Sequence, residues 1–112
     1  MPRDFKVYLQ DILLAIEKIN KYKLGLSFEE LMEDEKTIDA VIRNLEIIGE
    51  AVRNIPRHIR EQYQDIEWEK ISSLRNILIH EYFAIQMKII WEIIENKLPI
   101  LEIQIRKIVQ CK

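Results

Sequence analysis

The sequence contains little of what loops, sheets and disulfide-linked domains are made of. It has only two glycines, three prolines and one cysteine among 112 residues. Together with 48% hydrophobic and 32% charged residues, this scarcity favours a soluble all-helical protein over a sheet protein or a disordered chain. The single cysteine, Cys111, excludes an internal disulfide, and we therefore expect a reducing, cytoplasmic environment.

Long apolar runs and a strong charge of one sign are also absent. Lys, Glu or Asn interrupts every apolar run well before the ~18 residues that a membrane helix requires. The first six residues contain no apolar signal core, so we expect no membrane association. Seventeen basic and nineteen acidic residues give a net charge of -2, which argues against a general nucleic-acid binder. A local positive cleft remains compatible with this charge.

The length supports a single domain, residues 1–112, so an active site must lie within one small fold or between copies of it. Hydrophobic residues recur at three- and four-residue steps, which is the helical repeat. We expect an all-α, antiparallel four-helix bundle with an additional short helix. The expected main helices run from about Asp4 to Lys23, from near Ile38 toward Pro56, from about Ile66 to His80, and from about Ile85 to Val109.

Local signals mark the ends of these helices. Gly25 should end the first helix, and Ser27 with Glu30 three residues later has the form of a capping box that begins a short helix. Pro56 should stop the third helix and lead into a short helical turn that reaches Tyr63. Pro99 should either kink the last helix or restart it as a first-turn residue.

One segment combines several groups that handle phosphate esters. Residues 75–82, Arg-Asn-Ile-Leu-Ile-His-Glu-Tyr, bring a guanidinium, an amide, an imidazole and a phenol into an otherwise aliphatic stretch. Ser72, Asn76 and His80 are four apart and would form one polar stripe on a helix. Arg75 and His80 are roughly 140° apart on an ideal helix, so they converge only if the Arg side chain curls or the helix ends near His80.

Structural explanations exist for each of these residues. From the spacing alone, the favoured interpretation of His80 is a helix-end histidine that bonds a carbonyl or a carboxylate. Asn76 is as well suited to a helix hydrogen bond as to phosphate or His80. Glu81 fits a surface ion pair, and His58 a solvated surface position. Trp68 and Trp91 have the indoles to stack bases, but their spacing among isoleucines is more typical of core or interface residues.

The motif resembles the signature of the HEPN superfamily, and more closely the HepT toxins. The resemblance covers most of the chain: residues 43–51, Arg-Asn-Leu-Glu-Ile-Ile-Gly-Glu-Ala, are similar to a family segment, and so are the surroundings of Trp68, Trp91 and Leu98-Pro99. It reverses the preference for a structural His80. Three positions depart from the family: Ser73 replaces a frequent Gly, Glu67 a frequent Pro and Gln86 a frequent Asp.

The resemblance implies a metal-independent toxin ribonuclease in which Arg75 and His80 are catalytic and Asn76 is supporting. The ribose 2′-hydroxyl attacks the neighbouring phosphate; imidazole transfers protons near neutral pH and guanidinium binds phosphoryl oxygens. Because one His cannot easily serve as acid and base at once, the economical solution is a homodimer that brings two copies of Arg75 and His80 into one cleft. We expect no metal site and no cofactor, since two histidines and one cysteine far apart form no ligand cluster.

Tyr82 has a second implied role. In the HepT toxins, a partner of the MntA type, a minimal nucleotidyltransferase antitoxin, transfers AMP to this tyrosine, as in type VII-like toxin-antitoxin modules. A bulky anionic adenylate beside the site would exclude an RNA phosphate. The structural alternative is a tyrosine that packs its ring and exposes its hydroxyl. At the level of the whole chain, the alternative is a non-enzymatic helical binding subunit that docks the nucleotidyltransferase.

Overall fold

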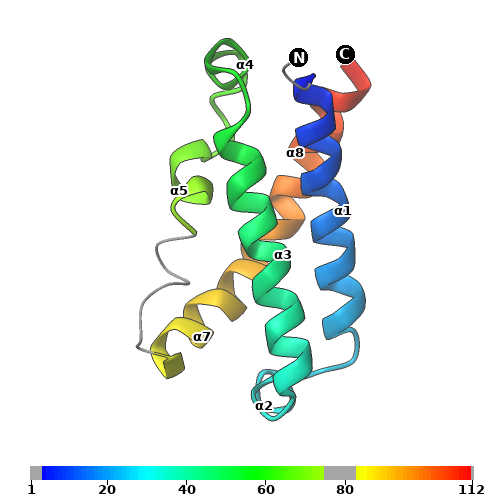
Figure 1. Cartoon of the computed structure of the whole chain (residues 1–112), viewed down its shortest axis with the longest axis vertical. Coiled ribbons are helices and arrows are strands. Elements are labelled where there is room, and N and C mark those ends of the chain that lie inside the picture. Colours follow the sequence, from blue (N-terminus) through cyan, green and yellow to red (C-terminus); the bar gives the residue numbers. More distant parts are fainter. Residues whose placement is uncertain (1–3, 75–82, 112) are drawn as a thin grey trace.

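The computed structural model describes residues 4–74 and 83–111 (Figure 1). The expected all-α class is confirmed, since helices dominate the described residues and strands are absent among them. Two long helices, α1 (Phe5–Lys23) and α3 (Glu35–Arg53), lie side by side and run in opposite directions. The last helical run, α7 (Phe83–Glu92), η1 (Ile93–Lys97) and α8 (Leu98–Cys111), brings α8 against α1.

The predicted signals at the start of the chain are confirmed. Gly25 has a φ of 79°, a left-handed conformation that glycine adopts without strain, directly after the end of α1. The short helix α2 (Phe28–Met32) begins with the expected capping box. The Ser27 Oγ accepts from the Glu30 amide at 3.1 Å, and the Ser27 amide donates to the Glu30 carboxylate at 3.0 Å. The turn at Gly25 and the capped helix α2 together connect α1 to α3.

The third helix begins and ends through local chemistry. Asp34 caps α3 by accepting from the Thr37 amide at 3.1 Å and from the Thr37 hydroxyl at 2.7 Å. The helix ends at Arg53, and the expected turn after Pro56 is α4 (Arg57–Gln62). The apolar face of α3 lies in a core that it shares with the other helices. The largest fully buried side chains are Leu9, Ile12, Ile16, Ile19, Leu31, Leu45, Ile48, Ile55, Met87, Ile90, Ile94 and Ile105.

The expected helix from Ile66 to His80 is confirmed in part. Its described part is α5 (Trp68–Ser72), which begins two residues later than expected; a turn at Ser73 interrupts the helix, and Leu74 is helical again. The hydroxyls of Ser72 and Ser73 donate to the carbonyls of Glu69 and Lys70 at 3.0 and 2.7 Å. Such back-bonding competes with helix continuation. Residues 75–80 lie outside the described residues. The short α5 packs against α3 as the fourth member of the bundle.

Pro99 is a first-turn residue of α8, the position that one of the two expected outcomes gave it, although the helical run does not stop before it. As the second residue of α8 it lies where its missing N–H and fixed φ are tolerated. Directly before it, η1 forms a π-helical turn, and the Leu98 amide donates to the Ile93 carbonyl. The wider turn accommodates a proline inside a continuous helical run, a known cause of helix irregularity.

A cluster of side chains joins the beginning and the end of the chain. The Lys23 Nζ lies 2.9 Å from a carboxylate oxygen of Glu95 and 5.9 Å from the centroid of the Trp91 ring. Phe28 meets the same indole edge to face, with ring centroids 5.9 Å apart. Trp68 is buried, and its Nε1 donates to main-chain carbonyls. Both tryptophans therefore serve packing, as their spacing indicated.

Candidate active site

The predicted site residues Arg75, Asn76, His80 and Tyr82 lie outside the described residues, as does Glu81. The structure describes the two ends from which this segment is held. The chain enters it after Leu74, whose side chain is buried, and leaves it at Phe83, the first residue of α7. The described neighbours of the predicted site are therefore Leu74 on its N-terminal side and Phe83 on its C-terminal side.

Gly49 lies where α3 packs against α5 and Leu74, the residues that directly precede Arg75 in the chain. A methyl group at this position would lie 3.6 Å from the Ile71 carbonyl oxygen and 3.9 Å from the Leu74 Cβ. The helix that carries Gly49 thus approaches the backbone of α5 closely, immediately before Arg75 in the chain. No role for Gly49 was predicted from the sequence. The available indication was a glycine in the middle of a helix with a strong hydrophobic repeat, a position that usually has a packing or functional reason.

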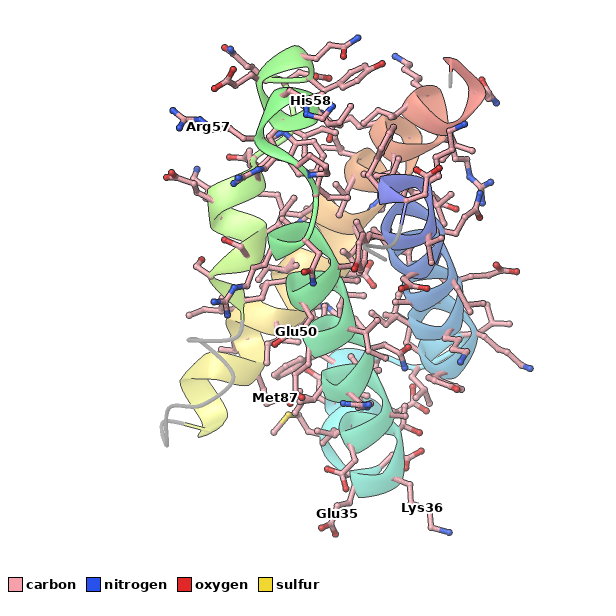
Figure 2. All side chains as sticks on the ribbon, turned by 45° about the horizontal axis from the view of Figure 1, so that its top comes forward. Glu35, Lys36, Glu50, Arg57, His58 and Met87 are labelled. Atoms are coloured by element: carbon pink, nitrogen blue, oxygen red, sulfur yellow. The ribbon has the colours of Figure 1, made fainter. Side chains whose placement is uncertain are left out.

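The exit from the motif is anchored by α7. Met87 and Ile90 are almost completely buried, so α7 is packed in the core from Met87 onward. Figure 2 labels Met87 on α7 and Glu50 on α3, the carboxylate that follows Gly49. The segment 75–82 therefore lies between two parts of the chain that pack in the core: α5 with Leu74 before it, and α7 after it.

Of the expected polar stripe, only Ser72 is described. Its hydroxyl is bonded to the carbonyl of Glu69, so its described partner belongs to its own helix. The expectation for His58 is confirmed: the side chain is exposed on α4. Figure 2 shows His58 and Arg57 at the α4 end of the molecule, opposite to Glu35 and Lys36 at the α2 end.

A groove of about 370 Å³ lies between α5 and the run η1–α8, directly beside the entry to the motif. Local sequence patterns do not indicate this groove, because its walls come from segments about thirty residues apart in the chain. Its floor is apolar and includes Leu74, the residue before Arg75. The apolar lining residues are Ile71, Leu74, Ile93, Leu98, Ile100 and Leu101.

The polar part of this groove consists of two lysines, two carboxylates, one serine and one glutamine. Glu67 accepts from Lys70 at 2.8 Å and lies 3.8 Å from the Nζ of Lys97, so one carboxylate connects both sides. The hydrogen bond from Lys70 and the charges of both lysines hold the pKa of Glu67 below its ordinary value. The same pair raises the pKa of Lys70. A second contact also joins the two sides of the groove: the Gln104 Nε2 on α8 donates to the carbonyl oxygen of Asp65 at 3.0 Å.

No group of three or more His, Cys, Asp or Glu side chains with the arrangement of a metal site occurs among residues 4–74 and 83–111. None of the helices in these ranges combines the length and apolarity needed to cross a membrane.

These features define a small all-α protein in which the segment 75–82, which contains Arg75, His80 and Tyr82, connects two parts of the chain that pack in the core. The model of the family described as "Ribonuclease HepT-like" matches residues 12–108, a range that contains the whole segment. A protein of Caldanaerobacter subterraneus subsp. tengcongensis, named as a candidate RNase, is 43% identical over 103 residues, which are 92% of each chain. The chain belongs to the HepT-like ribonuclease family. No solved structure matches it significantly.

Two other relatives extend the comparison. A Thermococcus cleftensis protein named as a probable ribonuclease HepT is 39% identical over 108 residues, covering 96% of this chain and 98% of the relative. A Methanocaldococcus jannaschii protein named as a gamma-glutamylcyclotransferase and candidate RNase is 38% identical over 110 residues. This match covers 98% of the present chain but 50% of that relative, which is therefore about twice as long.

Proposed function

We propose that this chain is a toxin ribonuclease that cleaves RNA without a metal ion, as a single domain of residues 1–112 acting in the cytoplasm. The observation that carries the proposal is the family match over residues 12–108, combined with the presence of Arg75, His80 and Tyr82 at the family's spacing. The anchoring of the segment by Leu74 and by α7 supports it, because a catalytic segment must be held in place.

The proposed reaction is attack of a ribose 2′-hydroxyl on the adjacent phosphorus. One imidazole accepts the 2′-hydroxyl proton, the P–O5′ bond breaks, and an acid delivers a proton to the leaving 5′-oxygen. The products are a 2′,3′-cyclic phosphate and a 5′-hydroxyl end. The guanidinium of Arg75 binds the phosphoryl oxygens as negative charge develops on them. Asn76 is the supporting residue.

The proposed active form is a homodimer. Each chain has only two histidines, and His58 lies on α4 at one end of the molecule. One His80 therefore has no second histidine of its own chain as an obvious acid–base partner. Two copies of Arg75 and His80 that meet in one cleft supply both proton transfers.

The proposed regulator is a minimal nucleotidyltransferase antitoxin of the MntA type. It transfers AMP from ATP to the phenol oxygen of Tyr82 and releases pyrophosphate. The added phosphodiester brings negative charge and bulk two residues after His80, and both oppose binding of an RNA phosphate.

The decisive experiment is RNA cleavage by the purified, unmodified protein in the presence of EDTA. We expect full activity and 2′,3′-cyclic phosphate ends, because the nucleophile belongs to the substrate. Arg75→Ala and His80→Ala should each lose activity by about a hundredfold or more, the scale of removing an acid–base group, while circular dichroism stays unchanged. Activity that needs magnesium, or products with 3′-hydroxyl ends, would contradict the mechanism.

A second function is favoured by one observation, the net charge of -2. An acidic chain is poorly suited to general RNA binding and well suited to service as a docking subunit for the nucleotidyltransferase. Absence of RNA cleavage by the unmodified protein, with tight binding of the partner, would establish this alternative.

A further inference from the structure

The groove between α5 and η1–α8 has no role in the reaction as proposed. It nevertheless adjoins the catalytic segment, because its lining includes Ser73 and Leu74, and Arg75 follows them directly in the chain. Its volume of about 370 Å³ falls within the usual range for small-molecule sites. A ligand in this groove would lie next to the point where the proposed chemistry begins.

We infer that the groove holds a nucleotide adjacent to the phosphate that is cleaved. The inference rests on the proposed function, since it assigns part of the same RNA substrate to a specific surface. The base lies on the apolar floor, and its phosphate lies at the rim that Lys70 and Lys97 form.

The apolar floor fits the face of a base. Ile93 is partly buried against the core and Ile100 is 54% exposed, so both present side-chain surface to the groove. A base has apolar faces and polar edges, so it needs a wall that combines both kinds of group. Gln104 and Asp65 supply the polar edge, since the amide of Gln104 donates to Asp65 and keeps its own oxygen as an acceptor.

The rim fits a phosphate. Lys70 on α5 and Lys97 on η1 both point to Glu67, at 2.8 and 3.8 Å, so the two cations are held near each other across the groove. Both lysine side chains are more than half exposed. Exposed ion pairs contribute little to stability, and phosphate oxygens can therefore replace the Glu67 carboxylate as the partner of the lysines at small cost.

The test compares two exposed isoleucines on α8. Ile100 lines the groove, whereas Ile103, which is 58% exposed, does not. Ile100→Ala should raise the KM for a short mixed-sequence RNA by about fivefold with little change in kcat, since it removes contact with a base and leaves the chemistry intact. Ile103→Ala should behave as wild type.

The same design applies to charge. Lys97→Ala should weaken binding of the oligonucleotide and lower the salt dependence by about one phosphate contact, whereas Lys88→Ala, an exposed lysine on α7, should not. Binding is measured by fluorescence anisotropy in the His80→Ala background, which leaves the RNA intact. This readout does not depend on turnover.

The outcomes separate the two proposals. If wild type cleaves RNA and the groove variants match their controls, the groove inference fails and the ribonuclease function stands. If Ile100→Ala changes the oligomeric state in light scattering, the groove is a contact between copies, and the inference also fails. If the protein neither cleaves nor binds RNA, both proposals fail.

Discussion

Tyr82 follows His80 by two residues, and its phenol oxygen is the proposed point of control. In this proposal the His80 imidazole transfers protons, whereas the Tyr82 phenol accepts AMP. Replacement of one functional group at a time therefore separates activity from regulation.

We predict that Tyr82→Phe keeps most of the ribonuclease activity and escapes neutralisation by the nucleotidyltransferase. The variant retains the aromatic ring but lacks the oxygen that accepts AMP. Incubation with the partner, ATP and magnesium should add the mass of AMP to the wild-type peptide that contains Tyr82 and to no peptide of the variant. Equal neutralisation of both proteins would show that binding alone inhibits.

At the scale of helices, the two glycines have opposite reasons to be there. Gly25 adopts a φ of 79° with nothing within 4 Å of an added methyl group. Gly49 has an ordinary helical backbone but lies against the backbone of α5. Backbone conformation therefore favours glycine at the first position, whereas the approach of another helix limits the second position to a small side chain.

We predict that Gly49→Ala leaves the protein as stable or raises its stability by up to about 1 kcal/mol, because alanine favours a helix interior. The contacts of its methyl group, at 3.6 to 3.9 Å, are ordinary van der Waals distances. Gly25→Ala should cost about 1 kcal/mol despite its open surroundings. Thermal unfolding measures both.

Gly49→Leu provides the control for the approach of the two helices. Its extra atoms have to displace α5, with an expected cost of about 1–3 kcal/mol. Because α5 leads directly into Arg75, ribonuclease activity should fall further than the loss of folded protein explains. A fully active and stable Gly49→Leu variant would refute the importance of this approach.

The sequence predicted those helical features that depend on nearby residues. Gly25, the pair Ser27 and Glu30, and Pro99 each act within one helical turn, so their outcomes could be anticipated. The early end of α5 was not anticipated, because the serine back-bonds that accompany it compete with a strong apolar repeat. The groove could not be predicted either, since contacts such as that of Gln104 with Asp65 join residues 39 apart.

At the scale of the whole molecule, the proposed homodimer makes a quantitative prediction. If two copies of His80 share one cleft, mixing wild type with His80→Ala should reduce activity with the square of the wild-type fraction. Independent sites would give a linear loss. The matched control is Arg57→Ala, a substitution of an exposed residue on α4 that pairs with Glu61. A monomer in light scattering with full activity would contradict the shared cleft.

The packing of α8 against α1 has a consequence for protein synthesis. Buried residues of α1 such as Leu9, Ile12 and Ile16 belong to the same core as Ile105 and Ile108, which the ribosome adds almost a hundred residues later. During translation, α1 and α3 can pair early, whereas the catalytic segment emerges before the helix that completes the core. A nascent chain therefore carries Arg75 and His80 before it has a finished fold to hold them. We therefore expect an activity that depends on this fold to begin only after α8 has left the ribosome.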